Sequence, residues 1–287
     1  MAEVVAIVNQ KGGVGKTTIA INLAASLAYL GKKTLLIDAD PQADATMGLG
    51  FDKYSSEDGL FEALIGKQEL VNVIRKTGVD KLDFICSSPR LAGADVELAT
   101  LYEKSRYSRL KEVLKNVKRK YDYVIIDCPP GIGLNVNILN ASDDVIIPSV
   151  CHYFSKQSLL EAYATVRKIK NTFNKKLYVS GIVLNMYDPK FNINKEIEAE
   201  IREMFVNSRV YKTTLPRSNK IINPNRKNHL FLIPPINSIT KVITKYIITA
   251  PVSGSMNVNT AGIRTIIIIF IKKKNSSLIV GSKYLSL

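Results

Sequence analysis

A glycine-rich segment near the start of the chain restricts the fold more than any other feature of the sequence. Residues 9–18 read Asn-Gln-Lys-Gly-Gly-Val-Gly-Lys-Thr-Thr, between an apolar run at 4–8 and a helical pattern that begins at Thr17. Glycines let the backbone turn tightly and point its N–H groups at phosphate oxygens, and the positive end of the helix dipole adds to this attraction. The segment therefore predicts a phosphate-binding loop between a strand and a helix.

The individual residues of this loop have expected roles. We expect Lys16 to reach the β- and γ-phosphates of a nucleotide and the Thr17 hydroxyl to ligate Mg²⁺. ATP and Mg²⁺ are thus the expected ligands. The residues predicted to cradle the nucleotide are Lys11, Gly12, Gly13, Val14, Gly15, Lys16, Thr17 and Thr18.

Carboxylates follow two further strand-like runs. Asp38 and Asp40 come directly after the apolar residues 35–37, and Asp127 follows the β-prone residues 123–126 in the pattern of a Walker B strand. Because ligands of open parallel sheets bind at the carboxyl ends of the strands, these carboxylates should lie beside the phosphates. We expect Asp127 to hold the Mg²⁺, directly or through a water molecule.

Strand-like and helical patterns alternate over the first two-thirds of the chain. Several of the strand runs are continuously apolar, which is typical of strands covered on both faces in a parallel sheet. The alternation predicts an α/β fold with a doubly wound, mostly parallel sheet flanked by helices, as in P-loop NTPases.

The charge is distributed unevenly along the chain. All 25 acidic residues lie at or before Glu203, whereas 13 of the 40 lysines and arginines lie after it. A basic C-terminal portion favours a polyanionic partner. From residue 222 the chain is rich in isoleucine and has no trustworthy helical period. We therefore predict one ATPase domain at 1–221 and interpret 222–287 as an atypical basic tail, frameshifted or disordered.

The form of the loop, with the additional Lys11 before the glycine pair, resembles the deviant Walker A class of ATPases. Beyond the loop, residues 38–46, 91–98, 127–130, 141–148 and 213–217 resemble the ParA/Soj family of chromosome- and plasmid-partitioning ATPases. By that resemblance Lys11 acts on the nucleotide of a second subunit, and Asp40 is the carboxylate needed for hydrolysis. Asp38 would lie in the outer shell of the metal, and Gly12 at the dimer face.

The resemblance also implies partners. ATP would close a homodimer that binds DNA without sequence preference, and a centromere-binding protein of the ParB type would stimulate hydrolysis and release the DNA. The positions that match the family's DNA contacts are Lys190 and Lys220, with Arg217 nearby. Three scattered cysteines and the lack of a secretory signal favour a cytoplasmic protein. The resemblance to a family that binds DNA implies association with the nucleoid. Ser218 departs from the family, which usually has asparagine there.

Three other functions compete with partitioning. A membrane-associated septum-site regulator of the same ATPase class would need a C-terminal amphipathic helix, and residues 266–274 are too short for one, so no stable membrane association is expected. An iron–sulfur reductase subunit would need two cysteines at a dimer seam. Cys128 precedes two prolines instead of the loop of small residues that such a cluster requires. A non-hydrolysing regulator is disfavoured because all the expected catalytic residues are present.

Overall fold

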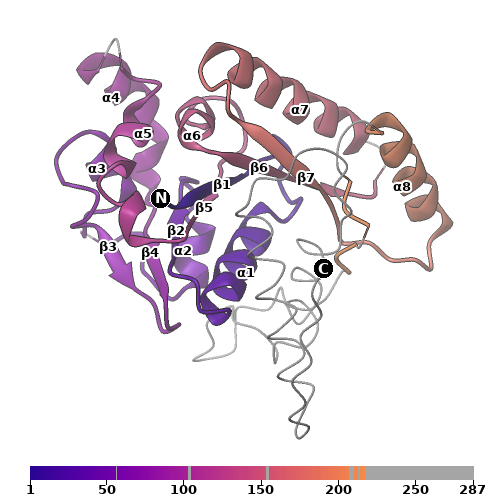
Figure 1. The fold of residues 1–287 in the computed structure, drawn as a ribbon, viewed down its shortest axis with the longest axis horizontal. Helices are drawn as coiled ribbons and strands as arrows, with labels where there is room; N and C mark the ends of the chain where they lie inside the picture. Colours follow the sequence, from indigo (N-terminus) through magenta and orange to yellow (C-terminus); the bar gives the residue numbers. More distant parts are fainter. Residues whose placement is uncertain (56, 103–104, 153–154, 207–209, 213, 217–287) are drawn as a thin grey trace, which may run out of the picture.

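A computed structural model describes residues 1–55, 57–102, 105–152, 155–206, 210–212 and 214–216 (Figure 1). Its centre is a seven-stranded sheet in the order β3-β4-β2-β5-β1-β6-β7. All neighbouring strands are parallel except the edge pair β3 and β4. The strands are β1 (Glu3–Ile7), β2 (Thr34–Asp38), β3 (Ile74–Lys76), β4 (Leu82–Ile85), β5 (Tyr123–Asp127), β6 (Asp144–Val150) and β7 (Tyr178–Asn185).

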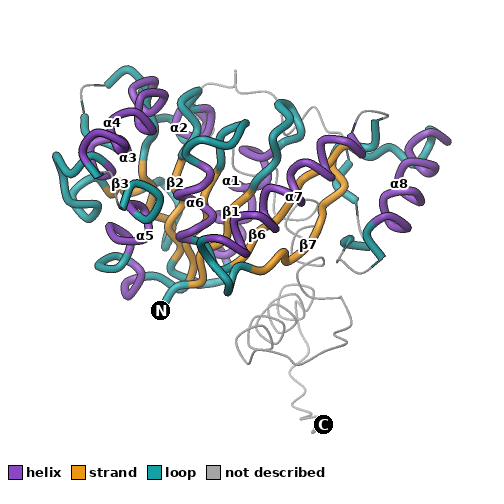
Figure 2. The backbone as a smooth tube through the Cα atoms, turned by 90° about the horizontal axis from the view of Figure 1, so that it is seen from above, coloured by secondary structure: helices purple, strands orange, loops and turns teal. Residues whose placement is uncertain are grey.

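Helices cover both faces of the sheet, and the strands run side by side between them (Figure 2). The α-helices are α1 (Lys16–Tyr29), α2 (Asp44–Gly48), α3 (Leu60–Leu64), α4 (Ala94–Leu101), α5 (Arg109–Leu114), α6 (Asn135–Ala141), α7 (Ser155–Thr172) and α8 (Asn192–Met204). Apolar residues of α1 and α2 belong to the core on one face, and those of α3 to α8 belong to the core on the other.

The continuously apolar strands are buried on both sides. In β2, Leu35 and Ile37 enter the core beneath α3 to α8, whereas Leu36 enters the core beneath α1. Alternate residues of a strand point to opposite faces, so a strand between two helical layers needs an apolar side chain at every position. This confirms the predicted doubly wound α/β architecture.

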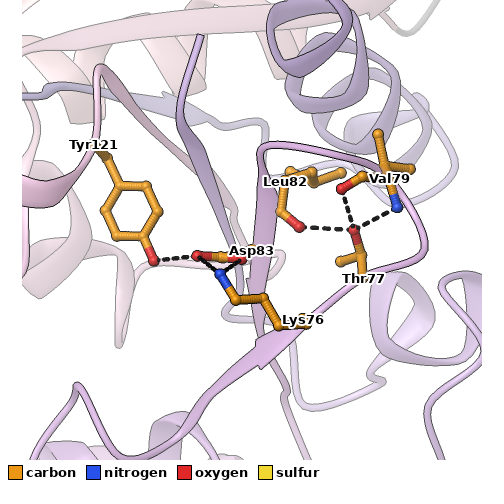
Figure 3. Close-up of polar contacts among 6 residues, drawn as sticks. All are labelled: Lys76, Thr77, Val79, Leu82, Asp83 and Tyr121. Atoms are coloured by element: carbon orange, nitrogen blue, oxygen red, sulfur yellow. Dashed lines mark hydrogen bonds and ion pairs between the residues drawn. The ribbon is translucent and has the colours of Figure 1, made fainter. Parts of the chain in front are cut away.

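Polar contacts hold the amino edge of the sheet, opposite the expected nucleotide edge (Figure 3). The Asp83 carboxylate accepts hydrogen bonds from Lys76 Nζ at 2.9 and 3.1 Å and from the Tyr121 hydroxyl at 2.7 Å. Beside them, the Thr77 hydroxyl donates to the Leu82 carbonyl at 2.7 Å. The contacts of Lys76 and Thr77 stabilise the pairing of the short antiparallel strand β3 with β4.

Two segments are less regular than the rest of the fold. Between Ala94 and Lys120 the described chain forms α4, α5 and a 3-10 turn at Lys118–Lys120. The described residues after α8 form two isolated bridges with β7 and the segment after it, Ile182–Val210 and Tyr187–Pro216. The predicted tail at 222–287 lies outside the described residues. Within the described part of the chain, none of the helices has the length and apolar character to cross a membrane.

Candidate active site

The glycine-rich loop joins β1 to α1 with the geometry its sequence predicts. Gly13 and Gly15 have φ angles of +72° and +88°, a backbone region that residues with a Cβ atom rarely adopt. Lys16, the first residue of α1, is buried, and its Nζ atom lies 3.4 Å from the Lys11 carbonyl oxygen. The backbone of the loop thus lies next to the ammonium group that is expected to bind the phosphates.

Two buried asparagines hold this loop in place, and the sequence did not reveal either role. Asn9 donates from Nδ2 to the Pro148 carbonyl at 2.7 Å and accepts the Lys11 N–H at Oδ1 at 2.9 Å. Asn185, at the end of β7, donates from Nδ2 to the Val14 carbonyl at 2.8 Å. The only available signal for Asn185 was a polar residue at the carboxyl end of an apolar strand.

Asp38 and Asp127 are brought together by the pairing of β2 with β5, in which they are register partners. Both side chains are fully buried. The oxygens of Asp38 accept hydrogen bonds from the chain itself, namely from the Asp40 N–H at 3.1 Å and from the Thr46 N–H and hydroxyl at 2.8 and 2.7 Å. In contrast, neither oxygen of Asp127 has a hydrogen-bond partner within the described part of the chain.

The electrostatics of these carboxylates follow from their burial. Burial, together with the nearby Asp38, raises the pKa of Asp127 well above its ordinary value, although Thr17 and Lys16 lower it. Burial also raises the pKa of Asp38 to about 7, although the hydrogen bonds from Thr46 and Asp40 lower it. The Asp127 carboxylate is therefore poorly solvated, and a bound cation would stabilise its charged form.

Asp127 and Thr17 fit a magnesium site. A buried carboxylate without hydrogen-bond donors beside a hydroxyl group supplies the oxygen ligands that Mg²⁺ prefers. Among the described residues there is no cluster of three or more His, Cys, Asp or Glu side chains that could hold a metal. Mg²⁺ in such a site would take most of its ligands from water and nucleotide phosphates, which is usual for this ion.

Asp40 lies two residues beyond the end of β2 and is only partly buried. Its Oδ1 atom accepts the Gln42 N–H at 3.0 Å, and its carbonyl accepts the Ser87 hydroxyl at 2.7 Å. Burial raises the pKa of the Asp40 carboxyl, while the Gln42 N–H and the charge of Lys16 lower it. Asp40 is thus placed near the loop lysine but retains access to solvent.

The remaining predicted residues are divided between the described and undescribed parts of the chain. Gly12 and Gly13 are exposed, and an added Cβ would meet no atom within 4 Å at either position. Lys190 is exposed beyond the end of β7, where its N–H donates to Asp188 Oδ1 at 3.0 Å. Arg217 and Lys220 lie outside the described residues.

We predict that Asp127→Asn stabilises the ligand-free protein, because it removes a charge that burial disfavours. The free energy of unfolding at pH 8 should rise by about 0.5–2 kcal/mol, while binding of ATP with Mg²⁺ weakens. Because the folded protein holds the protons of Asp38 and Asp127 to a higher pH than the unfolded chain does, wild-type stability should fall as pH rises from about 4 through about 7.

Urea unfolding at pH 5, 6, 7 and 8 without nucleotide would measure both effects. The fall in stability with pH should be smaller in Asp127→Asn than in the wild type. Asp80→Asn, which changes an exposed carboxylate between β3 and β4, is the matched control and should leave the pH profile unchanged. A less stable Asp127→Asn protein at pH 8 would contradict the prediction.

Comparisons with known proteins identify the family of the chain. Residues 2–179 match the family model described as an AAA domain. The chain is 41% identical over 237 residues to the sporulation initiation inhibitor protein Soj of Bacillus subtilis, covering 82% of this chain and 92% of Soj. It is 38% identical over 222 residues to the chromosome partitioning protein ParA of Myxococcus xanthus, covering 77% of each.

A solved structure that is similar in fold contains a nucleotide and magnesium. Cobyrinic acid a,c-diamide synthase from Mycobacterium smegmatis, crystallised with bound ADP and magnesium, superposes with a TM-score of 0.72 at 30% identity. The match covers 76% of this chain and 88% of the synthase. The nucleotide and the metal are thus observed in a protein of the same architecture.

Proposed function

Because this chain belongs to the ParA/Soj family of partitioning ATPases, we propose that it uses ATP hydrolysis to segregate chromosome or plasmid DNA. The observation that carries the proposal is the buried Asp127 carboxylate without hydrogen-bond donors, placed beside Thr17 and Lys16 of the phosphate-binding loop. This arrangement supports binding of ATP together with Mg²⁺. When bound, Mg²⁺ neutralises charge on the β- and γ-phosphates.

Each residue of the site has a proposed part in hydrolysis. Lys16 and the backbone N–H groups of residues 12–18 bind the phosphates, and Thr17 and Asp127 hold the magnesium. Asp40 orients or polarises the attacking water, since its carboxylate lies near Lys16 and reaches solvent. Asp38, whose oxygens are occupied by the chain itself, supports the segment that carries Asp40.

We also propose that two copies of the chain close around two nucleotides. Supporting this, Gly12 is exposed and has open space around it, so a partner subunit could approach the backbone closely. Lys11 would then neutralise transition-state charge on the partner's nucleotide, the role that an arginine finger has in other ATPases. Basal hydrolysis by a single subunit should accordingly be slow.

The proposed cargo is DNA bound without sequence preference, through Lys190, Arg217 and Lys220. The proposed protein partner is a ParB-like centromere-binding protein that stimulates hydrolysis, and the proposed location is the nucleoid. Lys190 supports the assignment because it is exposed beyond the carboxyl end of β7, the end at which Asn185 contacts the phosphate-binding loop. We further propose that residues 1–221 form one ATPase domain of the ParA type.

We predict that DNA binding requires ATP and weakens steeply with salt, because it depends on contacts with phosphates. The double variant Lys190→Glu, Lys220→Glu should bind every DNA sequence about tenfold or more weakly and hydrolyse ATP at the basal rate of the wild type. Titration of fluorescent duplexes of unrelated sequence, at several salt concentrations with and without ATP, would measure this.

The matched control is Lys175→Glu, Lys176→Glu, which makes the same charge change at two exposed residues just before β7, on the opposite edge of the sheet. It should bind DNA with nearly wild-type affinity. Equal affinity with and without ATP would contradict the proposed function and would indicate that basic residues elsewhere attract DNA regardless of nucleotide state.

A further inference from the structure

A closed ring of hydrogen bonds, two of them buried and two partly buried, surrounds the main chain of Asp40. The ring passes through Asp38, Thr46, Ser87 and Asp40, and it joins the segment after β2 to the segment after β4. Asp38, Thr46 and Ser87 are each no more than 3% exposed. Such a network, in which each member has a hydrogen-bond partner and three members are buried, holds its members in one arrangement.

Thr46 is the centre of the ring. Its hydroxyl donates to Asp38 Oδ2 at 2.7 Å, and the same oxygen accepts the Ser87 N–H at 2.9 Å. A hydroxyl group has one proton and two lone pairs, so both contacts can form at the same time. Thr46 therefore links the buried carboxylate of β2 to the segment that follows β4.

Ser87 and Asp38 hold Asp40 from its two sides. The Ser87 hydroxyl donates to the Asp40 carbonyl at 2.7 Å, and the Asp40 N–H donates to Asp38 Oδ1 at 3.1 Å. The Asp40 carbonyl also accepts the Ala43 N–H at 2.9 Å. With both of its peptide groups fixed, Asp40 has little freedom beyond rotation of its own side chain.

We propose that Thr46 and Ser87 are positioning residues for hydrolysis, which set the direction of the Asp40 carboxylate through the Asp40 main chain. The inference depends on the proposed role of Asp40 and adds two residues that do not themselves touch the nucleotide. Misplacement of a reacting group by about 1 Å can cost about 100-fold in rate. Loss of the ring should therefore lower the hydrolysis rate while ATP binding is preserved.

Thr46→Val tests the proposal with little change in side-chain shape. It removes the hydroxyl donor to Asp38 Oδ2, which keeps the hydrogen bond from the N–H of residue 46, and it leaves the Ser87 N–H without its acceptor. In steady-state hydrolysis of ATP with Mg²⁺ we expect kcat to fall by about 10–100-fold and the KM for ATP to change by less than about threefold. Thr46→Ser keeps the hydroxyl and should restore kcat to within about threefold of the wild type.

Ser87→Ala is the second variant and is less disruptive. The Asp40 carbonyl keeps its contact with the Ala43 N–H, so we expect a smaller fall in kcat, about 3–10-fold, again at nearly constant KM. If Thr46→Val does not fold, the kcat of Ser87→Ala decides the question alone.

Two control variants remove hydroxyl groups far from the site. Thr77→Val deletes the hydroxyl that donates to Leu82 at the amino edge of the sheet (Figure 3). Ser142→Ala deletes a buried hydroxyl that donates to the Ile138 carbonyl at 2.7 Å. Both should lower thermal stability without changing kcat, so a loss of kcat that merely followed stability would appear in them as well.

Wild-type kcat in Thr46→Val or in Ser87→Ala would overturn the proposal, as would equal slowing in Thr46→Ser and Thr46→Val. A rise in KM at constant kcat would do the same, because it would place the ring in nucleotide binding. Asp40→Ala, measured in parallel, distinguishes failure of the proposed role of Asp40 from failure of the proposed positioning role of Thr46 and Ser87. If it hydrolyses ATP normally, the proposed role of Asp40 fails; if only it is slow, the positioning inference fails.

Discussion

Lys16→Ala should abolish detectable ATP binding. Lys16 is buried at the start of α1 with its ammonium group beside the loop backbone, and removing it leaves phosphate charge without its closest cation. Loss of one partner from a buried charged pair costs about 2–5 kcal/mol, which corresponds to at least about 30-fold in Kd. Isothermal titration of the purified variant with ATP and Mg²⁺ would measure the loss.

Lys33→Ala is the control, since Lys33 is an exposed lysine on the opposite edge of the sheet, just before β2. It should bind ATP as the wild type does. Wild-type affinity in Lys16→Ala would show that the glycine-rich loop is not the phosphate site, and the whole assignment of the site would then be wrong.

Asp40→Ala should separate ATP binding from hydrolysis. The carboxylate is partly exposed and lies outside the loop proposed to bind the phosphates, so the variant should keep its affinity for ATP. Loss of a group that handles the proton of the attacking water should slow hydrolysis by about 10²–10⁴-fold. With ATP no longer consumed, the dimer should accumulate.

Single-turnover hydrolysis and light scattering after size exclusion, each with ATP and Mg²⁺, would measure both effects. The control is Asp44→Ala, which removes another exposed carboxylate from the same segment, at the first residue of α2. It should hydrolyse ATP and release its dimer normally. If Asp40→Ala turned over ATP at the wild-type rate, another group would have to activate the water.

The sequence alone determined the phosphate-binding loop, the double-wound sheet and the edge on which the site lies. These features are local. The loop needs glycines at positions 13 and 15 because its backbone adopts positive φ angles there. This requirement can be recognised from residues that are close together in the sequence. The direction of parallel strands then brings Asp38 and Asp127 to the same edge once their strands are recognised.

Only the tertiary structure decided which groups each carboxylate contacts at that edge. Asp38 and Asp127 look alike in the sequence, each ending an apolar strand, yet Thr46 supplies donors to Asp38 and no described residue hydrogen-bonds to Asp127. The contacts of Asn185 with Val14 and of Ser87 with Asp40 join residues 171 and 47 positions apart. Such pairs depend on the order of strands in the sheet, because burial and hydrogen-bond partners are properties of neighbours in space.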